Sequence, residues 1–250
     1  QALGGAKNHM IVMPDADLDA AADAAISAGY GSAGERCMAV SVVVAVGEVA
    51  DELIAKIADR MPQVTVGDGT APGIEMGPLI TRDALERVTG FVAGAEGEGA
   101  RLVVDGRELD VPAGGFFIGP SLVDGVTPGM RVYDEEIFGP VLSVVRVSSY
   151  DDAVALINDN RYANGTAVFT RDGKTARQFE FDIEVGMVGV NVPIPVPIGA
   201  FSFGGWKDSL FGDTHMYGPE AFQFYTRRKV VTTRWPDASE SQISLGFPTH

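Results

Sequence analysis

Cys37 is the only cysteine in the 250-residue chain, and its surroundings suggest chemistry. It stands in GYGSAGERCMAVSVVVAVG, after a glycine-rich turn, beside Arg36 and ahead of a run of strand-forming residues. A thiolate is a strong nucleophile, and a neighbouring positive charge stabilises it. Glycines in the turn would also let the backbone amide of Cys37 approach a substrate. From these residues alone, Cys37 is either a reactive nucleophile or a small buried apolar residue.

A dinucleotide-binding pattern, G-x-G-x-x-G, is spelled in the same turn by Gly29, Gly31 and Gly34, with Asp51 downstream. That motif works when it follows a strand and opens a helix, because the helix N-terminus then meets the pyrophosphate. Here it follows an expected helix and leads into an expected strand. We therefore interpret it as a helix stop and a flexible turn.

Strand and helix patterns alternate along the chain. Strands are predicted at 9–13, 38–47, 101–106, 115–126, 139–149, 165–170 and 187–191, and helices at 15–31, 49–61, 81–97, 150–160 and 172–183. Each crossover helix must pack back on the sheet, so this order predicts an α/β fold with a parallel-rich sheet and helices on both faces. The side chains of residues 221–235 alternate as in an exposed strand with charges on one face. An unpaired strand of this kind has to be covered by another part of the protein or by a partner. We expect pairing with another subunit, and hence a homo-oligomer.

Composition narrows the classes of partner. The net charge of −15 disfavours nucleic acid and anionic lipid, so a small molecule or another protein is expected. No apolar run is long enough to span a membrane, the first residues do not resemble a signal peptide, and one cysteine suits a reducing compartment, so a cytoplasmic location is expected. His9, His215 and His250 lack metal-ligand spacing, and no metal is expected.

Six segments, in order and over nearly the whole chain, resemble the aldehyde dehydrogenase family: LGGAKNHMIVMPDADLD, GERC, GDGTAPGIEMGPLI, FFIGPSLVDGV, DEEIFGPVLSV and FSFGGWKDS. The resemblance implies a catalytic domain at 1–224 and an oligomerisation strand and tail at 225–250. It implies that Cys37 attacks an aldehyde, that the Cys37 N–H holds the oxyanion, and that hydride passes to NAD. It further implies that Glu136 binds the nicotinamide ribose and that Phe138 lies against the nicotinamide end. From residue type alone, Glu136 would be interpreted as a charged residue on an exposed loop and Phe138 as an aromatic ring packed in the core.

One departure from the family pattern concerns deacylation. Hydrolytic members begin this region with E-L-G-G-K, where the glutamate activates water, but Ala2 or Leu3 occupies that position here. Neither can take a proton, and the next carboxylate is Asp15. This favours coenzyme A as acyl acceptor, as in the methylmalonate-semialdehyde dehydrogenase branch, which the chain resembles most.

In that branch the substrate is a semialdehyde that carries a carboxylate and loses CO2. Arg36 would be a suitable partner for the carboxylate, or it pairs with Glu35 or a core carbonyl. By the same resemblance Phe203 walls the acyl pocket, or it packs in the core.

The chain opens inside a family motif, and in complete members the NAD-binding domain lies largely upstream. We therefore expect weak or no dehydrogenase turnover from this polypeptide alone. Two classes of function stay open: an enzyme, or catalytic part of one, that uses NAD and coenzyme A, and a truncated non-catalytic domain acting as an interaction module. A fragment of a hydrolytic aldehyde dehydrogenase is the alternative within the first class.

Overall fold

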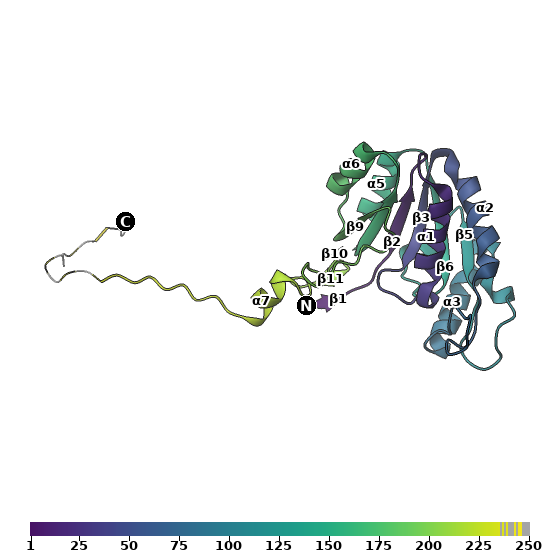
Figure 1. The fold of residues 1–250 in the computed structure, drawn as a ribbon, viewed down its shortest axis with the longest axis horizontal. Coiled ribbons are helices and arrows are strands. Elements are labelled where there is room, and N and C mark those ends of the chain that lie inside the picture. The colour runs from purple at the N-terminus through teal and green to yellow at the C-terminus, as the bar shows by residue number, and fades with distance from the viewer. Residues whose placement is uncertain (236, 238, 240–242, 244, 247–250) are drawn as a thin grey trace.

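A seven-stranded sheet organises the chain in the computed structural model, which describes residues 1–235, 237, 239, 243, 245 and 246 (Figure 1). Its strand order is β4-β5-β6-β3-β2-β8-β9. Only β4 runs antiparallel to its neighbour, and the remaining pairs are parallel. The strands are β2 (Asn8–Val12), β3 (Val40–Val46), β4 (Arg101–Val104), β5 (Ser121–Asp124), β6 (Val141–Val147), β8 (Gly165–Phe169) and β9 (Met187–Val190). The predicted parallel-rich α/β fold is confirmed.

Helices lie between the strands of the sheet along the chain. They are α1 (Leu18–Tyr30), α2 (Ala50–Arg60), α3 (Arg82–Ala95), α4 (Arg131–Asp134), α5 (Tyr150–Asp159) and α6 (Gly173–Asp182). The chain moves one way across the sheet from β2 through α1 to β3, and the opposite way from β6 through α5 to β8 and through α6 to β9. Because such crossovers are right-handed, this reversal places α1 and α5 on opposite faces.

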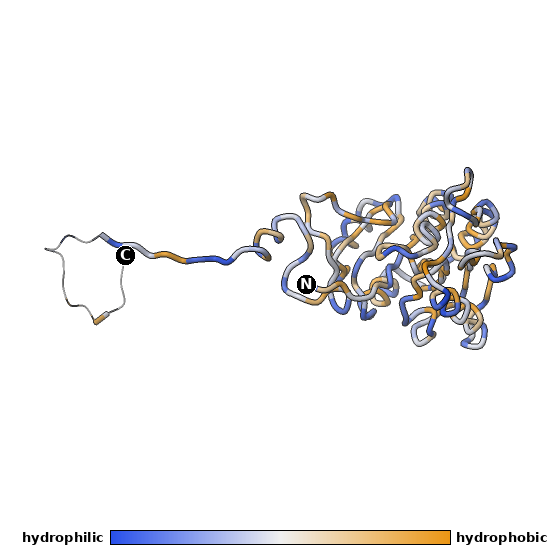
Figure 2. Tube along the Cα trace, turned by 90° about the horizontal axis from the view of Figure 1, so that it is seen from below, coloured by the Kyte–Doolittle hydropathy of each residue, from blue (hydrophilic) through white to orange (hydrophobic). Residues whose placement is uncertain are grey.

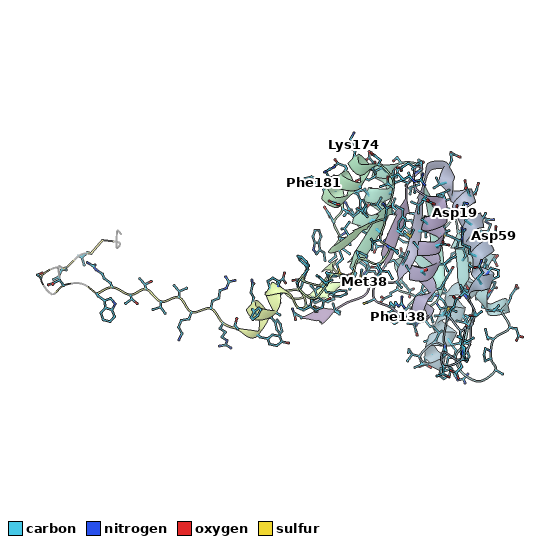
Figure 3. The ribbon with its side chains drawn as sticks, in the orientation of Figure 1. Asp19, Met38, Asp59, Phe138, Lys174 and Phe181 are labelled. Carbon is cyan, nitrogen blue, oxygen red and sulfur yellow. The ribbon has the colours of Figure 1, made fainter. Side chains whose placement is uncertain are left out.

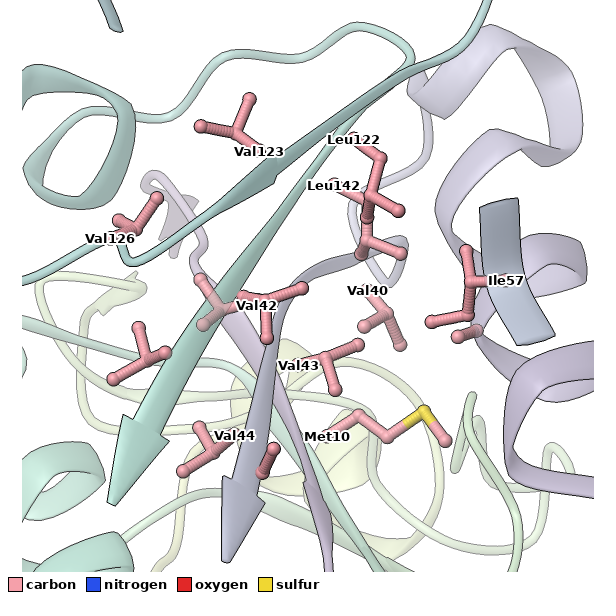
Figure 4. Close-up of a cluster of buried hydrophobic side chains, with 14 of the residues drawn as sticks. Met10, Val40, Val42, Val43, Val44, Ile57, Leu122, Val123, Val126 and Leu142 are labelled. Carbon is pink, nitrogen blue, oxygen red and sulfur yellow. The ribbon is translucent and has the colours of Figure 1, made fainter. Parts of the chain in front are cut away.

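The core lies between the sheet and these helices. Every residue of β2 is buried, and so is every residue of β3 except Ser41. Strands covered on both faces read as continuous apolar runs, which explains the sequence VSVVVAV. Figure 4 shows valines of β3 packing with Met10, Leu122, Leu142 and Ile57.

A smaller region beside the sheet holds two short antiparallel pairs. β1 (Ala2–Leu3) pairs with β11 (Leu210–Phe211), and β7 (Tyr162–Ala163) pairs with β10 (Trp206–Lys207). The first pair ties the first residues of the chain to residues after 200, and the second ties residues 162–163 to 206–207. They could not be predicted, because two-residue strands carry no periodicity.

The predicted strand at 221–235 is wrong in its first part. Pro219–Tyr225 forms helix α7, with Pro219 at its first turn and Glu220 beside it. Proline presets a helical φ and an acidic residue favours a helix N-terminus, and these signals outweigh a short alternation. Residues 226–235 lead away from the body without a ladder partner among the described residues (Figures 1 and 2). Of the predicted tail, residues 236, 238, 240–242, 244 and 247–250 lie outside the described part.

Candidate active site

Cys37 lies in a tight turn that enters β3. The N–H of Ala39 donates to the carbonyl of Arg36 at 3.0 Å, which makes Cys37 and Met38 the two central residues of a β-turn. The Cys37 side chain is exposed, whereas Met38 is buried. The backbone N–H of Cys37 has no acceptor in the described part of the chain. A free N–H beside an exposed sulfur is what an oxyanion donor requires.

The glycine-rich turn before Cys37 has an unusual backbone. Ser32, Ala33 and Gly34 have φ values of 54°, 55° and 70°, in the left-handed region. A Cβ on Gly34 would lie 2.2 Å from the carbonyl oxygen of Gly139, so the two glycine backbones are in direct contact. The turn thus follows α1 and leads to a strand, which confirms the interpretation of G-x-G-x-x-G as a helix stop.

A narrow crevice opens beside this glycine contact. Arg36, Cys37, Glu136 and Phe138 all line it, so the structure brings together four of the five predicted site residues. Arg36 and Cys37 precede β3, and Glu136 and Phe138 precede β6. Met38 and Phe138, labelled in Figure 3, mark this region. The crevice therefore lies where parallel strands begin.

Glu136 is the only carboxylate among the described residues that line the crevice. One of its oxygens accepts the N–H of Ala6 at 3.1 Å. Burial raises the pKa of the Glu136 carboxyl, while that N–H and the nearby Lys7 and Arg87 oppose the rise. The second oxygen accepts no hydrogen bond from the described residues, so it can accept one from a ligand hydroxyl.

Lys7 holds the segment that carries Glu136. Its ammonium group is buried and donates to the carbonyls of Val132 and Glu135, each at 2.7 Å. Burial lowers the pKa of Lys7 to about 7, and the charges of Glu136, Asp134 and Glu135 oppose that shift. Together with the Ala6 contact, these bonds attach the loop before β6 to the start of β2.

Phe138 stands at the mouth of the crevice with 38% of its surface exposed. Its φ of 51° is uncommon for an aromatic residue. Backbone strain of this kind persists where the surroundings hold it, commonly at functional sites. The alternative interpretation, that Phe138 packs in the core, does not fit a side chain with this exposure.

Phe203 lies apart from the crevice. It packs in a small buried cluster with Met38 and Met187, and its backbone pairs with Met216. The structure therefore places Phe203 behind the residue that follows Cys37, in the packing role that was the alternative interpretation. A role in the acyl pocket stays a prediction.

Arg36 is exposed beside Cys37. Its Nε donates to the Ser32 hydroxyl at 2.9 Å, and no carboxylate among the described residues lies within salt-bridge distance of it. It does not pair with Glu35, which instead accepts the Ile80 N–H at 3.5 Å. The guanidinium therefore keeps hydrogen-bond donors for a ligand carboxylate.

Two residues at the site were missed from sequence. The side-chain amides of Asn8 and Asn164 both donate to the Cys37 carbonyl, at 2.9 and 3.0 Å. Asn8 belongs to one of the family-like segments but was given no role there, and Asn164 was not singled out. A signal existed in each case: a polar residue at the start of a buried strand needs a partner.

Two kinds of feature are absent from the described residues. Their helices include none with the length and apolar character needed to cross a membrane. Within the same residues no three of the His, Cys, Asp and Glu side chains gather as metal ligands would.

The chain belongs to the aldehyde dehydrogenase family, because the sequence pattern of that family matches residues 1–231. Among curated proteins, malonate-semialdehyde dehydrogenase from Pseudomonas aeruginosa is 58% identical and matches 100% of this chain and 51% of that protein. The enzyme of the same name from Halalkalibacterium halodurans is 48% identical and matches 94% of this chain and 48% of that protein. The chain thus spans about half the length of the curated relatives it matches.

Comparison with solved structures leads to the same family. Methylmalonate-semialdehyde dehydrogenase from Oceanimonas doudoroffii superposes with a TM-score of 0.91 at 57% identity, over 95% of this chain and 49% of that one. A Sinorhizobium meliloti relative, crystallised in complex with NAD, gives a TM-score of 0.91 at 52% identity, over 96% of this chain and 49% of the other. The resemblance to the methylmalonate-semialdehyde branch is thus confirmed.

Proposed function

We propose that this chain forms the catalytic part of an enzyme that oxidises a semialdehyde through a thioester on Cys37 and transfers the acyl group to coenzyme A. The observation that carries the proposal is the shared crevice of Cys37, Arg36, Glu136 and Phe138. The names of the malonate- and methylmalonate-semialdehyde relatives supply the substrate class. The exposure of Cys37 supports an enzyme over a non-catalytic interaction module.

In the proposed reaction the Cys37 thiolate attacks the aldehyde carbon, and a C–S bond forms as the carbonyl oxygen becomes an oxyanion. The free Cys37 N–H donates to that oxyanion, and Arg36 pairs with the carboxylate at the other end of the substrate. NAD, when bound, supplies the hydride acceptor. Glu136 would accept hydrogen bonds from ribose hydroxyls, and the exposed ring of Phe138 would wall the nicotinamide end.

Coenzyme A is proposed as acceptor because the position at which hydrolytic members carry their water-activating glutamate holds no ionisable residue. Ala2 and Leu3 occupy an exposed two-residue strand, and neither ionises. A thiol ionises near pH 8.5, against about 15.7 for water, so a thiol supplies far more nucleophile at neutral pH without a general base. The acyl group on Cys37 should therefore be transferred to a thiol faster than to water.

Deacylation by coenzyme A is directly measurable. After the chain is acetylated with p-nitrophenyl acetate and excess ester is removed, we expect coenzyme A to shorten the lifetime of the thioester at least about tenfold relative to buffer. Intact mass spectrometry follows the loss of the acetyl group. Pantetheine at equal concentration is the matched control for a thiol without the nucleotide. Equally rapid loss in buffer would favour the hydrolytic alternative.

We also propose a homo-oligomer. Residues 226–235 include Arg227, Arg228, Lys229 and Arg234 and no acidic residue, in a chain of net charge −15, and Val230 and Trp235 are more than nine-tenths exposed. A basic segment with apolar side chains suits the acidic surface of a second copy. Sedimentation equilibrium should give a mass above that of the monomer, reduced when residues 226–250 are deleted. A monomeric mass for the intact chain at micromolar concentration contradicts the proposal.

A further inference from the structure

The carbonyl oxygen of Cys37 is held by two side chains from different strands. Asn8, the first residue of β2, donates to it at 2.9 Å, and Asn164, immediately before β8, donates at 3.0 Å. Both asparagines are buried. A carbonyl oxygen has two lone pairs, so these two amides saturate it.

Asn8 uses both of its amide hydrogens and its side-chain oxygen around the turn. Its second amide hydrogen donates to the Ala39 carbonyl at 2.8 Å, and its own oxygen accepts the Gly165 N–H at 3.0 Å. The β2–β3 register shifts between Asn8 and His9, so Ser41 is skipped in the pairing. Bulges of this kind redirect side chains, and this one lies where Asn8 meets the cysteine turn.

Asn164 binds the same carbonyl from the start of β8, which lies on the other side of β2 from β3. Its amide also contacts the Met38 sulfur at 3.0 Å. A Cβ on Gly165 would lie 2.4 Å from the terminal carbon of Met38, so the Met38 side chain packs directly against the residue after Asn164. The cysteine turn is therefore fastened to β2 by Asn8 and to the start of β8 by Asn164.

We propose that Asn8 and Asn164 are positioning residues that fix the peptide plane after Cys37 and so set the direction in which its sulfur and N–H face the crevice. The proposal rests on the proposed function, because it assigns these residues to acylation of Cys37. The carbonyl of Arg36 already accepts the N–H of Ala39, so the peptide planes on both sides of Cys37 are restrained. With its carbonyl saturated, the turn cannot rotate without breaking two partly buried hydrogen bonds.

The test compares Asn8→Ala, Asn164→Ala and Asn164→Asp in the full chain. Asn164→Asp keeps the side-chain volume but removes the donor. Asn158→Ala is the matched control, because the Asn158 amide also donates to a backbone carbonyl, that of Asp182 at 2.9 Å, and accepts the Glu184 N–H at 2.8 Å, away from the crevice. The readouts are the p-nitrophenolate burst rate per folded molecule, the melting temperature, and the pH profile of iodoacetamide labelling.

We expect the burst rate of the Asn8 and Asn164 variants to fall about 10- to 100-fold, because displacement of a nucleophile by about 1 Å costs that much. Iodoacetamide needs no oxyanion donor, so its rate should change less than about threefold and its pH midpoint should stay in place. Since Cys37 is the only cysteine, the label reports one site. Asn158→Ala should keep the wild-type burst rate.

Three results would overturn the inference. In the first, the Asn8 and Asn164 variants acylate as fast per folded molecule as Asn158→Ala, whatever their melting temperatures. In the second, alkylation falls in parallel with acylation, which would indicate general loss of the reactive sulfur. In the third, the wild-type chain shows no burst, and the proposed function falls together with this inference. If Asn8→Ala does not fold, the two Asn164 variants decide.

Discussion

Cys37→Ser is expected to abolish the p-nitrophenolate burst, with acylation at least about 1,000-fold slower than in the wild-type chain. A serine hydroxyl is hardly ionised at neutral pH, and none of the described residues lining the crevice is a histidine that could take its proton. The sulfur is exposed and adjacent to a free N–H, so the loss should come from the nucleophile and not from access. The burst is measured by stopped flow, and intact mass shows whether one acetyl group is attached.

Cys37→Ala serves beside it as a variant of similar volume with no nucleophile at all. Both variants should melt within a few degrees of the wild-type chain, because an exposed side chain contributes little to packing. A burst that survives in either variant would show that another residue is acylated. In that case Cys37 would not be the nucleophile, and the proposed function would be contradicted.

Gly34→Ala is expected to lower the free energy of unfolding by about 2–5 kcal/mol. About 1–2 kcal/mol comes from a non-glycine residue at a φ of 70°, and about 1–3 kcal/mol comes from a Cβ placed 2.2 Å from the Gly139 oxygen. Relief of that contact requires the cysteine turn to move away from the loop that carries Phe138. The burst should therefore weaken even in the folded fraction. Urea unfolding and the burst rate check the two effects.

Gly90→Ala is the matched control for this change. Gly90 lies in α3, and a Cβ there meets nothing within 4 Å. Alanine should raise stability by about 0.5–1 kcal/mol through helix propensity, and it should leave the burst unchanged. A Gly34→Ala chain as stable and as reactive as the wild type would contradict the close contact of the two glycine backbones.

The alternation of elements was predictable because it is written in local periodicity. Apolar runs such as 40–46 predict strands covered on both faces, and Asp17, whose carboxylate accepts the N–H groups of Asp19 and Ala20, is a helix-start signal. The grouping of Cys37 with Glu136 was predicted only through the family motif. Local pattern alone could not bring together residues 99 positions apart.

The sequence signals that Asn8 and Asn164 need partners, but which partners they meet could not be predicted, because that depends on strand order. Asn8 reaches both the cysteine turn and Gly165 only because β2 lies between β3 and β8. Periodicity identifies strands without saying which are neighbours. The left-handed backbone of Ser32 and Ala33 could not be predicted either, because neither residue type favours a positive φ.

The crevice lies where β2, β3 and β6 begin, although open α/β sheets commonly bind ligands at the edge where parallel strands end. That opposite edge, beyond Val12, Val46 and Phe169, holds none of the described crevice-lining residues. It therefore offers an attachment point away from the crevice. A dye, a fused reporter or a solid support joined there would leave the sulfur unobstructed while its reaction is followed.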